Sequence, residues 1–146
     1  MVTQLKNVYE IDDSFDRLNF DTLEKWLSKT YWSPGIKKDD ILRGARNSSI
    51  VVGCYAGNEQ VGFLRVISDK LRFAYILDVY VEENHRRKGI AQAMVRFVLD
   101  HPDYNGIQMW LLATKDAHGV YSKAGFKPLP NPEVWMVIRN HKIWSA

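Results

Sequence analysis

The chain has 146 residues, of which 46% are hydrophobic and 25% charged, the length and balance of one ordinary globular domain. We therefore expect a single domain over residues 1–146. Cys54 is the only cysteine, which excludes an intrachain disulfide. The formal net charge is only +3, and residues 1–73 hold 11 Lys and Arg against 10 Asp and Glu. Binding of nucleic acid through a strongly basic face is therefore not expected.

The sequence shows no targeting or membrane signal. The first 30 residues carry six acidic side chains, which fits neither a secretory signal nor a transit peptide. The longest apolar run, near residues 50–56, is far shorter than the roughly 18 residues that a membrane span needs. We expect a cytoplasmic protein that does not bind membranes.

The N-terminal part predicts one strand and two helices. Residues 5–11 alternate in polarity as a short strand does. A helix follows with Asp21 as its N-cap, and the turn signal at residues 33–35 ends it. A second helix is predicted over residues 38–46, where apolar side chains recur at helical spacing.

The middle of the chain predicts three antiparallel strands and then a crossover. Two β-rich runs, 50–55 and 60–67, flank a Gly/Asn turn, and a third run spans residues 73–81. An apolar helix over 90–99 leads to a buried strand over 107–113. A strand–helix–strand crossover makes its two strands parallel, so the third run and the buried strand should pair in parallel.

The C-terminal part predicts a short helix over residues 116–124 and a final strand over 134–138. The expected fold class is therefore α+β, with a mixed central sheet and flanking helices. This sheet is antiparallel at one end and parallel in the middle.

The turn that follows residues 73–81 is a candidate anion site. Arg86, Arg87 and Lys88 lie directly before Gly89, where a helix begins. The first N–H groups of a helix lack partners within it and the helix dipole adds positive charge, so this turn suits an anion. Gly89 removes a Cβ where a diphosphate would lie against the backbone. The alternative interpretation is a solvated basic loop.

Two motifs resemble those of one enzyme family. Arg86-x-x-Gly89-x-Ala91 resembles the (Gln/Arg)-x-x-Gly-x-(Gly/Ala) motif with which the GNAT superfamily of N-acetyltransferases binds the pyrophosphate of acetyl-CoA. Residues 117–126 are similar to the family's Ala-x-x-Leu-Tyr-x-x-x-Gly-Phe segment. The resemblance covers essentially the whole chain. It implies a GNAT-like acyl-CoA N-acyltransferase fold, with the sheet splayed between two parallel strands, and acetyl transfer from acetyl-CoA directly to a primary amine.

The resemblance also implies where acetyl-CoA lies. The strand matching residues 73–81 parts from the one matching 107–113, and the pantetheine arm pairs with the first as an added strand would. Thr114 stands where many members carry an Asn that bonds this arm. The cofactor-binding residues implied are Val79, Val81, Arg86, Arg87, Lys88, Gly89, Ile90, Ala91 and Thr114.

Tyr121 is the catalytic residue that the resemblance marks most clearly. Tyrosine at this motif position is, in many members, the general acid that protonates the departing CoA thiolate. The structural alternative is a half-buried tyrosine whose hydroxyl contacts solvent.

Asp78 is the only carboxylate in the strand before the turn. Acidic residues on this strand serve family members as a base or a substrate anchor, so Asp78 is the second catalytic candidate, with Glu82 or a water as alternative bases. Pairing with a structural cation is the other interpretation. Strict alternation would place Asp78 on the same face as Ala74, Ile76 and Tyr80.

Tyr31 and Trp32, beside a rigid turn, are the candidate acceptor-binding residues, and packing of the helix on the sheet is the alternative. No motif marks the acceptor, which is a small-molecule or peptide amine. We predict no metal site and either a monomer or a homodimer. The alternative function is a non-catalytic acyl-CoA-binding sensor or regulatory protein, which would keep the anion site without needing Tyr121 as an acid.

Overall fold

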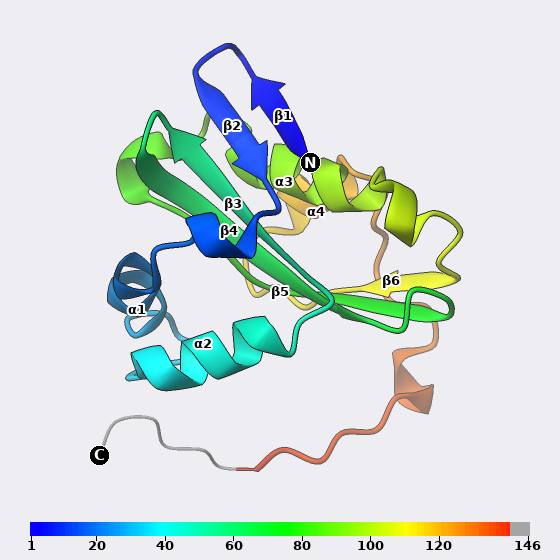
Figure 1. Ribbon diagram of the computed structural model, residues 1–146. Coiled ribbons are helices and arrows are strands. Elements are labelled where there is room, and N and C mark those ends of the chain that lie inside the picture. The colour runs from blue at the N-terminus through cyan, green and yellow to red at the C-terminus, as the bar shows by residue number, and fades with distance from the viewer. Residues whose placement is uncertain (141–146) are drawn as a thin grey trace.

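The computed structural model describes residues 1–140, and in this part of the chain a six-stranded mixed sheet has the order β1-β2-β3-β4-β5-β6 (Figure 1). The strands from β1 to β5 pair antiparallel, whereas β5 and β6 are parallel. The expected mixed sheet is confirmed, but its parallel pair lies at one edge of the described sheet and not in the middle. Its strands are β1 (Val2–Leu5), β2 (Tyr9–Asp12), β3 (Ile50–Ala56), β4 (Glu59–Ser68), β5 (Phe73–Val81) and β6 (Met109–Leu111).

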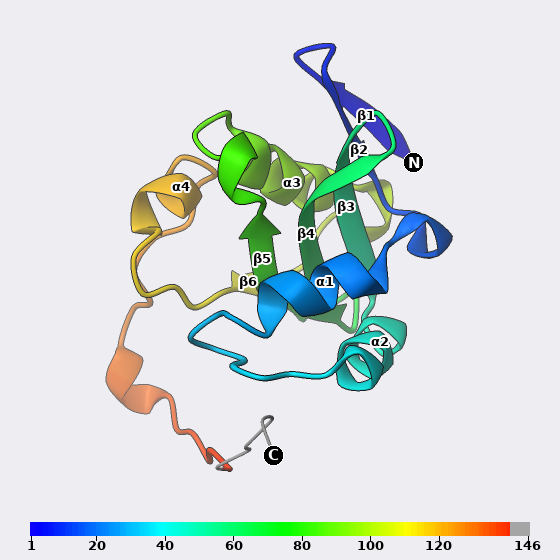
Figure 2. The same ribbon diagram turned by 90° about the vertical axis from the view of Figure 1, so that its left-hand side faces the viewer.

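Helices cover both faces of the sheet. α1 (Phe20–Leu27) and α2 (Lys38–Arg46) lie on one face, and α3 (Ile90–Leu99) and α4 (His118–Ser122) on the other (Figure 2). No helix within residues 1–140 is long and apolar enough to cross a membrane. The described part of the chain also contains four short 3-10 helices, η1 (Phe15–Arg17), η2 (Glu83–His85), η3 (Pro102–Tyr104) and η4 (Pro132–Val134).

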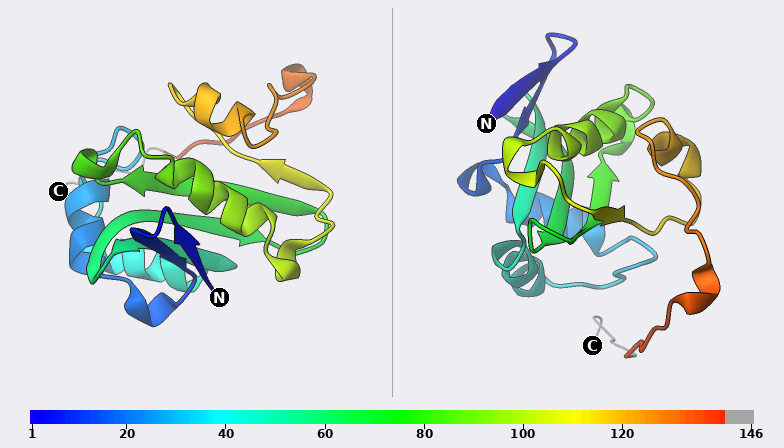
Figure 3. Two further views of the ribbon diagram at one scale, coloured as in Figure 1. Left: turned by 90° about the horizontal axis from the view of Figure 1, so that it is seen from above. Right: turned by 90° about the vertical axis from the view of Figure 1, so that its right-hand side faces the viewer.

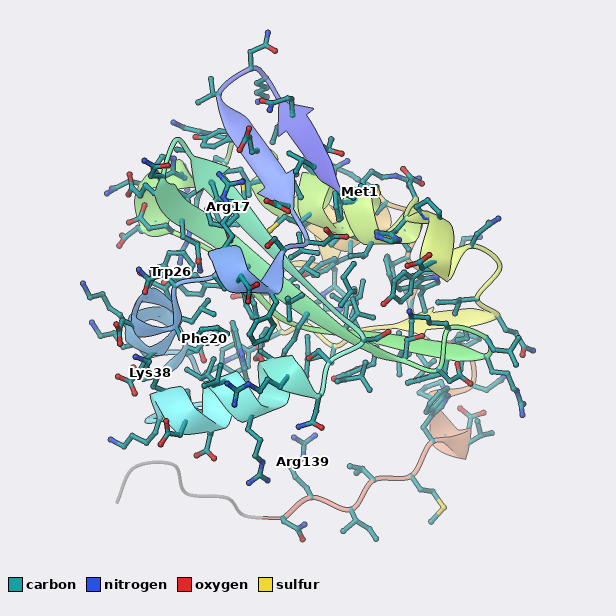
Figure 4. The ribbon with its side chains drawn as sticks, in the orientation of Figure 1. Met1, Arg17, Phe20, Trp26, Lys38 and Arg139 are labelled. Atoms are coloured by element: carbon teal, nitrogen blue, oxygen red, sulfur yellow. The ribbon has the colours of Figure 1, made fainter. Side chains whose placement is uncertain are left out.

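Each face of the sheet has its own apolar core. Neighbouring residues of β3 face opposite cores, since Val51 packs under α1 and α2 while Val52 packs under α3. Strands buried on both faces read as continuous apolar runs, which is why β3 and β4 show little alternation. The core under α1 and α2 consists of Leu18, Leu23, Trp26, Leu27, Ile41, Ala45, Val51 and Phe63. Figure 4 shows Trp26 on α1.

The predictions for β3, β4, β5, α2 and α3 are confirmed, but the N-terminal strand is wrong. Residues 5–11 cross a hairpin, because Lys6 and Asn7 both adopt a positive φ, 54° and 56°, between β1 and β2. These two residues are the centre of a tight turn that a hydrogen bond from the Val8 N–H to the Leu5 carbonyl oxygen closes at 3.1 Å, so the chain reverses at once. The N-cap of α1 is Asn19, not Asp21, because the Asn19 side chain accepts a hydrogen bond from the Thr22 N–H at 3.0 Å.

The C-terminal predictions are only partly correct. The strand expected over 107–113 is reduced to β6, a half-exposed strand at the edge of the sheet within the described residues, and the helix expected over 116–124 is reduced to α4. The strand expected over 134–138 is absent, because this segment pairs with no strand in the described chain.

A β-bulge interrupts β5 close to the end that leads to the turn. Phe63 pairs with Tyr80 and Arg65 pairs with Leu77, so two residues of β5 lie opposite one residue of β4. The first of the two, Asp78, has a φ of +56°, which is uncommon for a residue with a Cβ.

The bulge changes which side chains share a face. Ala74 and Ile76 lie in the core under α3, and so do the packed side chains of Val79 and Val81. Asp78 instead accepts hydrogen bonds from Trp32, in the loop between α1 and α2, and from Arg65, whose guanidinium also reaches Gly44 of α2. The expectation that Asp78 shares a face with Ala74 and Ile76 is therefore wrong, because the extra residue of the bulge reverses the alternation. Tyr80, which stacks on Trp26 of α1, does lie on the same face as Asp78, as expected.

The two parallel strands separate soon after they start. β5 pairs with β6 only over Phe73–Tyr75, opposite Met109–Leu111. Seen from above, the strands start side by side and then part, with α4 beyond β6 (Figure 3). The second half of β5 therefore has no strand beside it on this side within residues 1–140, and the expected splay of the sheet is confirmed.

Candidate active site

The start of α3 forms a cradle of free backbone donors, which we define as residues 87–92. Gly89 is the N-cap with a φ of +81°, and Arg87 also has a positive φ, of 63°. These conformations turn the backbone so that the N–H groups of residues 87–92 donate to no acceptor within residues 1–140. A Cβ at Gly89 would meet nothing within 4 Å, so the space in front of the cradle is open. Free donors at a helix start suit a phosphate group.

The three basic side chains of the turn differ in direction. The Arg86 Nε donates to the Val81 carbonyl oxygen at 2.9 Å, and its guanidinium lies 5.3 Å from the centre of the Tyr80 ring. Arg86 therefore folds back onto β5 and does not lie over the cradle. Arg87 and Lys88 are exposed and make no ion pair with any described residue.

A buried contact anchors the loop before the cradle. The Tyr9 hydroxyl and the His85 Nδ1 share a hydrogen bond of 2.8 Å, and the two rings meet edge to face. Tyr9 is only 3% exposed, so this bond ties η2 to the core through β2. The cradle is thus fixed from outside its own helix, which sequence reasoning did not reveal.

The free edge of β5 presents backbone groups beside the cradle. The Glu82 N–H donates to the Val61 carbonyl oxygen at 2.8 Å, which points Glu82 toward β4. The backbone N–H and C=O groups of successive strand residues alternate in direction. Those of Val79 and Val81 therefore point away from β4, into the gap between the second half of β5 and β6, which we call the opening. Arg86 takes the Val81 carbonyl, so both groups of Val79 and the N–H of Val81 are available.

Tyr121 lies on α4, across the opening from β5. Its side chain is only 9% exposed and belongs to the core under α3, so it is more buried than a half-buried surface tyrosine. Burial raises the pKa of its phenol above the usual value near 10, and the neighbouring Tyr31 and Asp116 add to the rise. Its hydroxyl has no hydrogen-bond partner in residues 1–140. The phenol is therefore protonated at neutral pH and able to donate.

Asp78 is tied to the protein by both carboxylate oxygens. Oδ1 accepts from the Trp32 Nε1 at 2.9 Å and Oδ2 accepts from the Arg65 Nε at 2.7 Å. Arg65 reaches further, to the Gly44 carbonyl oxygen and the Ser48 hydroxyl of the α2 region. Asp78 therefore does pair with a structural cation, Arg65, which was the alternative to a catalytic role. Each of its carboxylate oxygens still has a lone pair that can accept one further hydrogen bond.

The loop between α1 and α2 carries Tyr31 and Trp32 to this same place. The side chains are 58% and 43% exposed and meet edge to face, with ring centres 5.0 Å apart. The Tyr31 hydroxyl accepts from the Lys115 N–H at 3.3 Å, beyond β6, while Trp32 bonds Asp78 on β5. The two aromatics therefore bridge the splayed strands rather than packing α1 on the sheet.

Of the remaining predicted contacts, Thr114 has a local partner. Its Oγ1 accepts a hydrogen bond from the Ala117 N–H at 3.0 Å, which fixes the turn before α4 and leaves the hydroxyl proton free to donate. Cys54 is fully buried, and burial raises the pKa of its thiol to about 11, so it is not a nucleophile.

Sequence reasoning missed Arg65 and Lys115. Arg65 is the only cation in β4 and lies in its mostly apolar second half, and a cation in such a strand indicates an opposed carboxylate. In β5, the strand that pairs with it, Asp78 is the only carboxylate. Lys115 contributes its backbone N–H, which no sequence pattern marks.

A splayed pair of parallel strands with a donor cradle at the next helix defines an acyl-CoA acyltransferase fold. The model of the acetyltransferase (GNAT) family matches residues 5–126, and the chain belongs to this family. The resemblance seen in the two motifs is confirmed. None of the proteins with curated descriptions matches the chain.

Solved structures agree with this membership. A GNAT-family protein from Xanthomonas campestris pv. campestris is 33% identical, with a TM-score of 0.88 over 94% of this chain and 97% of that chain. Aminoglycoside 6'-acetyltransferase type Ii is 26% identical, with a TM-score of 0.66 over 80% of this chain and 82% of its own. A protein from Deinococcus radiodurans R1 shares the fold at 18% identity, with a TM-score of 0.73 over 95% and 93%.

The bonds of Asp78 lead to a stability prediction. The Asp78 and Arg65 side chains are 13% and 20% exposed, so their pair is shielded from solvent. Asp78→Asn keeps a residue that tolerates positive φ but removes the charge, and should lower the free energy of unfolding by about 1–2 kcal/mol. Asp78→Val should cost more, because a β-branched residue is strained at this φ. Urea unfolding measures both.

The matched control is Asp100→Asn, which removes the charge from an exposed pair with Arg96. Exposed pairs contribute little, so this variant should unfold almost as the parent does. Equal losses for Asp78→Asn and Asp100→Asn would contradict a structural role for the Asp78 pair.

Proposed function

We propose that this protein is an acetyl-CoA-dependent N-acetyltransferase that transfers the acetyl group directly to a primary amine. Acetyl-CoA supplies the acetyl thioester, and its transfer to the amine releases CoA as a thiolate. The observation that carries the proposal is the juxtaposition of the cradle, the free edge of β5 and the buried Tyr121 around one opening.

The cradle suits the diphosphate of acetyl-CoA. Its free N–H groups offer several donors to phosphate oxygens, and the start of α3 adds the positive end of a helix dipole. The open space at Gly89 lets phosphate oxygens approach the backbone. Arg87 and Lys88 add positive charge from the exposed side, whereas Arg86 stabilises the end of β5.

The edge of β5 suits the amides of the pantetheine arm. Val79 offers a donor and an acceptor, and Val81 offers a donor, in the arrangement that an added strand requires. A free N–H at this edge can also stabilise the negative charge that develops on the acetyl carbonyl oxygen. The Thr114 hydroxyl has one proton left to donate to the arm, fewer bonds than the Asn of many members offers.

Tyr121 is the general acid in this proposal. The departing thiolate needs a proton, and a phenol whose pKa is raised by burial keeps that proton until it is needed. The Tyr121 hydroxyl makes no hydrogen bond with another described residue, so it is free to donate to the thiolate.

The acceptor amine meets Asp78, Tyr31 and Trp32 in this proposal. The amine must lose a proton, which Asp78 takes directly or through a water that it holds. Glu82, whose carboxylate accepts a hydrogen bond from the Asn84 N–H at 2.9 Å, is the alternative base. The exposed aromatic pair provides a wall for a small-molecule or peptide amine.

Release of CoA thiol tests the proposed reaction. We expect acetyl-CoA to yield free thiol when the purified protein meets a panel of amines that includes polyamines, amino acids, peptides and aminoglycosides. Saturable binding of acetyl-CoA with no thiol release from any amine would favour the alternative, a non-catalytic acyl-CoA-binding sensor.

Tyr121→Phe tests the acid. We expect kcat to fall by roughly 10²–10⁴-fold, the usual contribution of a positioned acid, while the acetyl-CoA dissociation constant stays within about twofold. Because burial raises the pKa of Tyr121, the parent should not lose rate through its deprotonation between neutral pH and its usual value near 10. Turnover unchanged by the substitution would refute the acid role.

Gly89 tests the cradle through a charge-matched pair of variants. Asn and Asp have nearly the same shape and both tolerate the left-handed conformation, so Gly89→Asn and Gly89→Asp differ chiefly in charge. We expect Gly89→Asp to bind acetyl-CoA at least about tenfold more weakly than Gly89→Asn, because a carboxylate repels the diphosphate. Calorimetry gives both constants, and equal affinities would show that no diphosphate lies there.

A further inference from the structure

Lys115 places a positive charge beside the exposed aromatic pair. Its side chain is exposed and makes no ion pair with an acidic side chain in residues 1–140, including that of its neighbour Asp116. The charge of Asp78, by contrast, is already matched by Arg65 at 2.7 Å. The Lys115 charge is therefore uncompensated, and the proposed acetyl transfer gives it no role.

Two contacts with Tyr31 hold Lys115 at this place. The Lys115 N–H donates to the Tyr31 hydroxyl oxygen at 3.3 Å, and the ammonium lies 5.4 Å from the centre of the Tyr31 ring. The face of an aromatic ring attracts a cation at this distance. Figure 2 shows the loop between α1 and α2 extending toward the chain that leads into α4. Lys115 is thus positioned by the loop that carries the aromatic pair.

The Tyr31 hydroxyl gives this place a second donor. Its oxygen accepts the bond from the Lys115 N–H, and its own proton donates to no acceptor within residues 1–140. The indole N–H of Trp32 is not available, because it donates to Asp78. A phenol and an ammonium side by side suit an anionic oxygen, since hydrogen bonds that involve an ionised group are roughly twice as strong as neutral ones.

The other end of the aromatic pair suits an amine. Each Asp78 carboxylate oxygen accepts one bond from the protein, from Trp32 or from Arg65, and can accept one more. The two aromatic rings, with centres 5.0 Å apart, connect this carboxylate to Lys115. A molecule that lies along the pair therefore meets a carboxylate for its amine at one end and donors for an anion at the other.

We propose that the acceptor of the acetyl group carries a carboxylate besides its amine, as amino acids and short peptides do. Lys115 and the Tyr31 hydroxyl bind the carboxylate, while Asp78 receives the amine. This substrate class rests on the proposed function, because it is the acceptor of that same transfer. An acceptor with several positive charges, such as a polyamine, would place a cation against Lys115 and is disfavoured.

The carboxylate of the acceptor takes no part in the bond changes. The amine nitrogen bonds the acetyl carbon as the carbon–sulfur bond breaks, the surplus proton of the amine leaves through Asp78, and Tyr121 gives its proton to the thiolate. Lys115 therefore contributes only to binding of the acceptor. Its substitution should act mainly on KM and little on kcat.

Pairs of acceptors that differ only in the carboxylate test this site. A dipeptide and its C-terminal amide present the same amine, because a peptide bond separates the amine from the altered group. Over dipeptides of varied side chains, we expect the best kcat/KM to be at least about tenfold higher for the free acid than for its amide. The measurement is release of CoA thiol. Equal values, or higher values for the amides and polyamines, would overturn the proposal.

Lys115→Glu should reverse the preference, because a carboxylate in place of the ammonium repels the dipeptide and attracts cationic acceptors. We expect the dipeptide-to-amide ratio of kcat/KM to fall by roughly tenfold or more. Because the ratio is measured within one variant, a loss of folded protein or of acetyl-CoA affinity cancels.

The matched control is Lys25→Glu, which makes the same change of charge on the exposed surface of α1 and should keep the parent ratio. An equal fall in both variants would show a long-range effect of net charge and would overturn the role of Lys115.

Tyr31→Phe removes the second donor and keeps the ring that contacts the Lys115 ammonium. The dipeptide-to-amide ratio should fall by roughly fivefold or more, because a hydrogen bond to the charged carboxylate is lost. An unchanged ratio would contradict the part of the hydroxyl in this site.

The same assay distinguishes this proposal from the proposed function. Thiol release with none of the acceptors would refute the acetyl transfer itself. Thiol release that does not distinguish a dipeptide from its amide would support the transfer and refute only the carboxylate site.

Discussion

The two hydrogen bonds that Asp78 accepts from Arg65 and Trp32 hold together the parts on which the site depends. A positive φ costs a residue with a Cβ about 1–2 kcal/mol, so the bulge in β5 needs compensation. The shielded bond from Arg65 provides it and fixes β5 to β4. The bond from Trp32 brings the loop between α1 and α2 onto the same strand. One carboxylate therefore sets the course of β5 and the position of the aromatic pair.

The bulge has a further effect on the opening. Because it reverses the alternation of β5, Val79 and Val81 turn their side chains into the core under α3 and their backbone groups toward the gap beside β6. Without the bulge, the residues that alternate with Val79 and Val81 would present their backbone groups to this gap instead. The one extra residue of the bulge therefore determines which backbone donors and acceptors of β5 are available to a ligand. The side chains of Val79 and Val81 hold these backbone groups in place by packing in the core.

Much of this fold could be predicted from local patterns, and the failures have physical causes. α2, α3, β3 and β5 carry clear periodicity or turn signals, and their bounds agree closely with the prediction. The hairpin at Lys6 and Asn7 was missed because its positive φ values fall on residues other than glycine. The bulge was missed for the same reason, since Asp78 stands where a glycine would have signalled it.

The candidate site divides in the same way. The cradle could be predicted because Gly89 and three basic residues are adjacent in sequence. The Asp78 contacts with Arg65 and Trp32 join residues 13 and 46 positions away, and the bond between Tyr9 and His85 spans 76 positions. Such contacts follow from register and packing, which one sequence does not encode locally. The strand expected over 134–138 failed for a related reason, because its composition favours a strand but the described chain brings no other strand to pair with it.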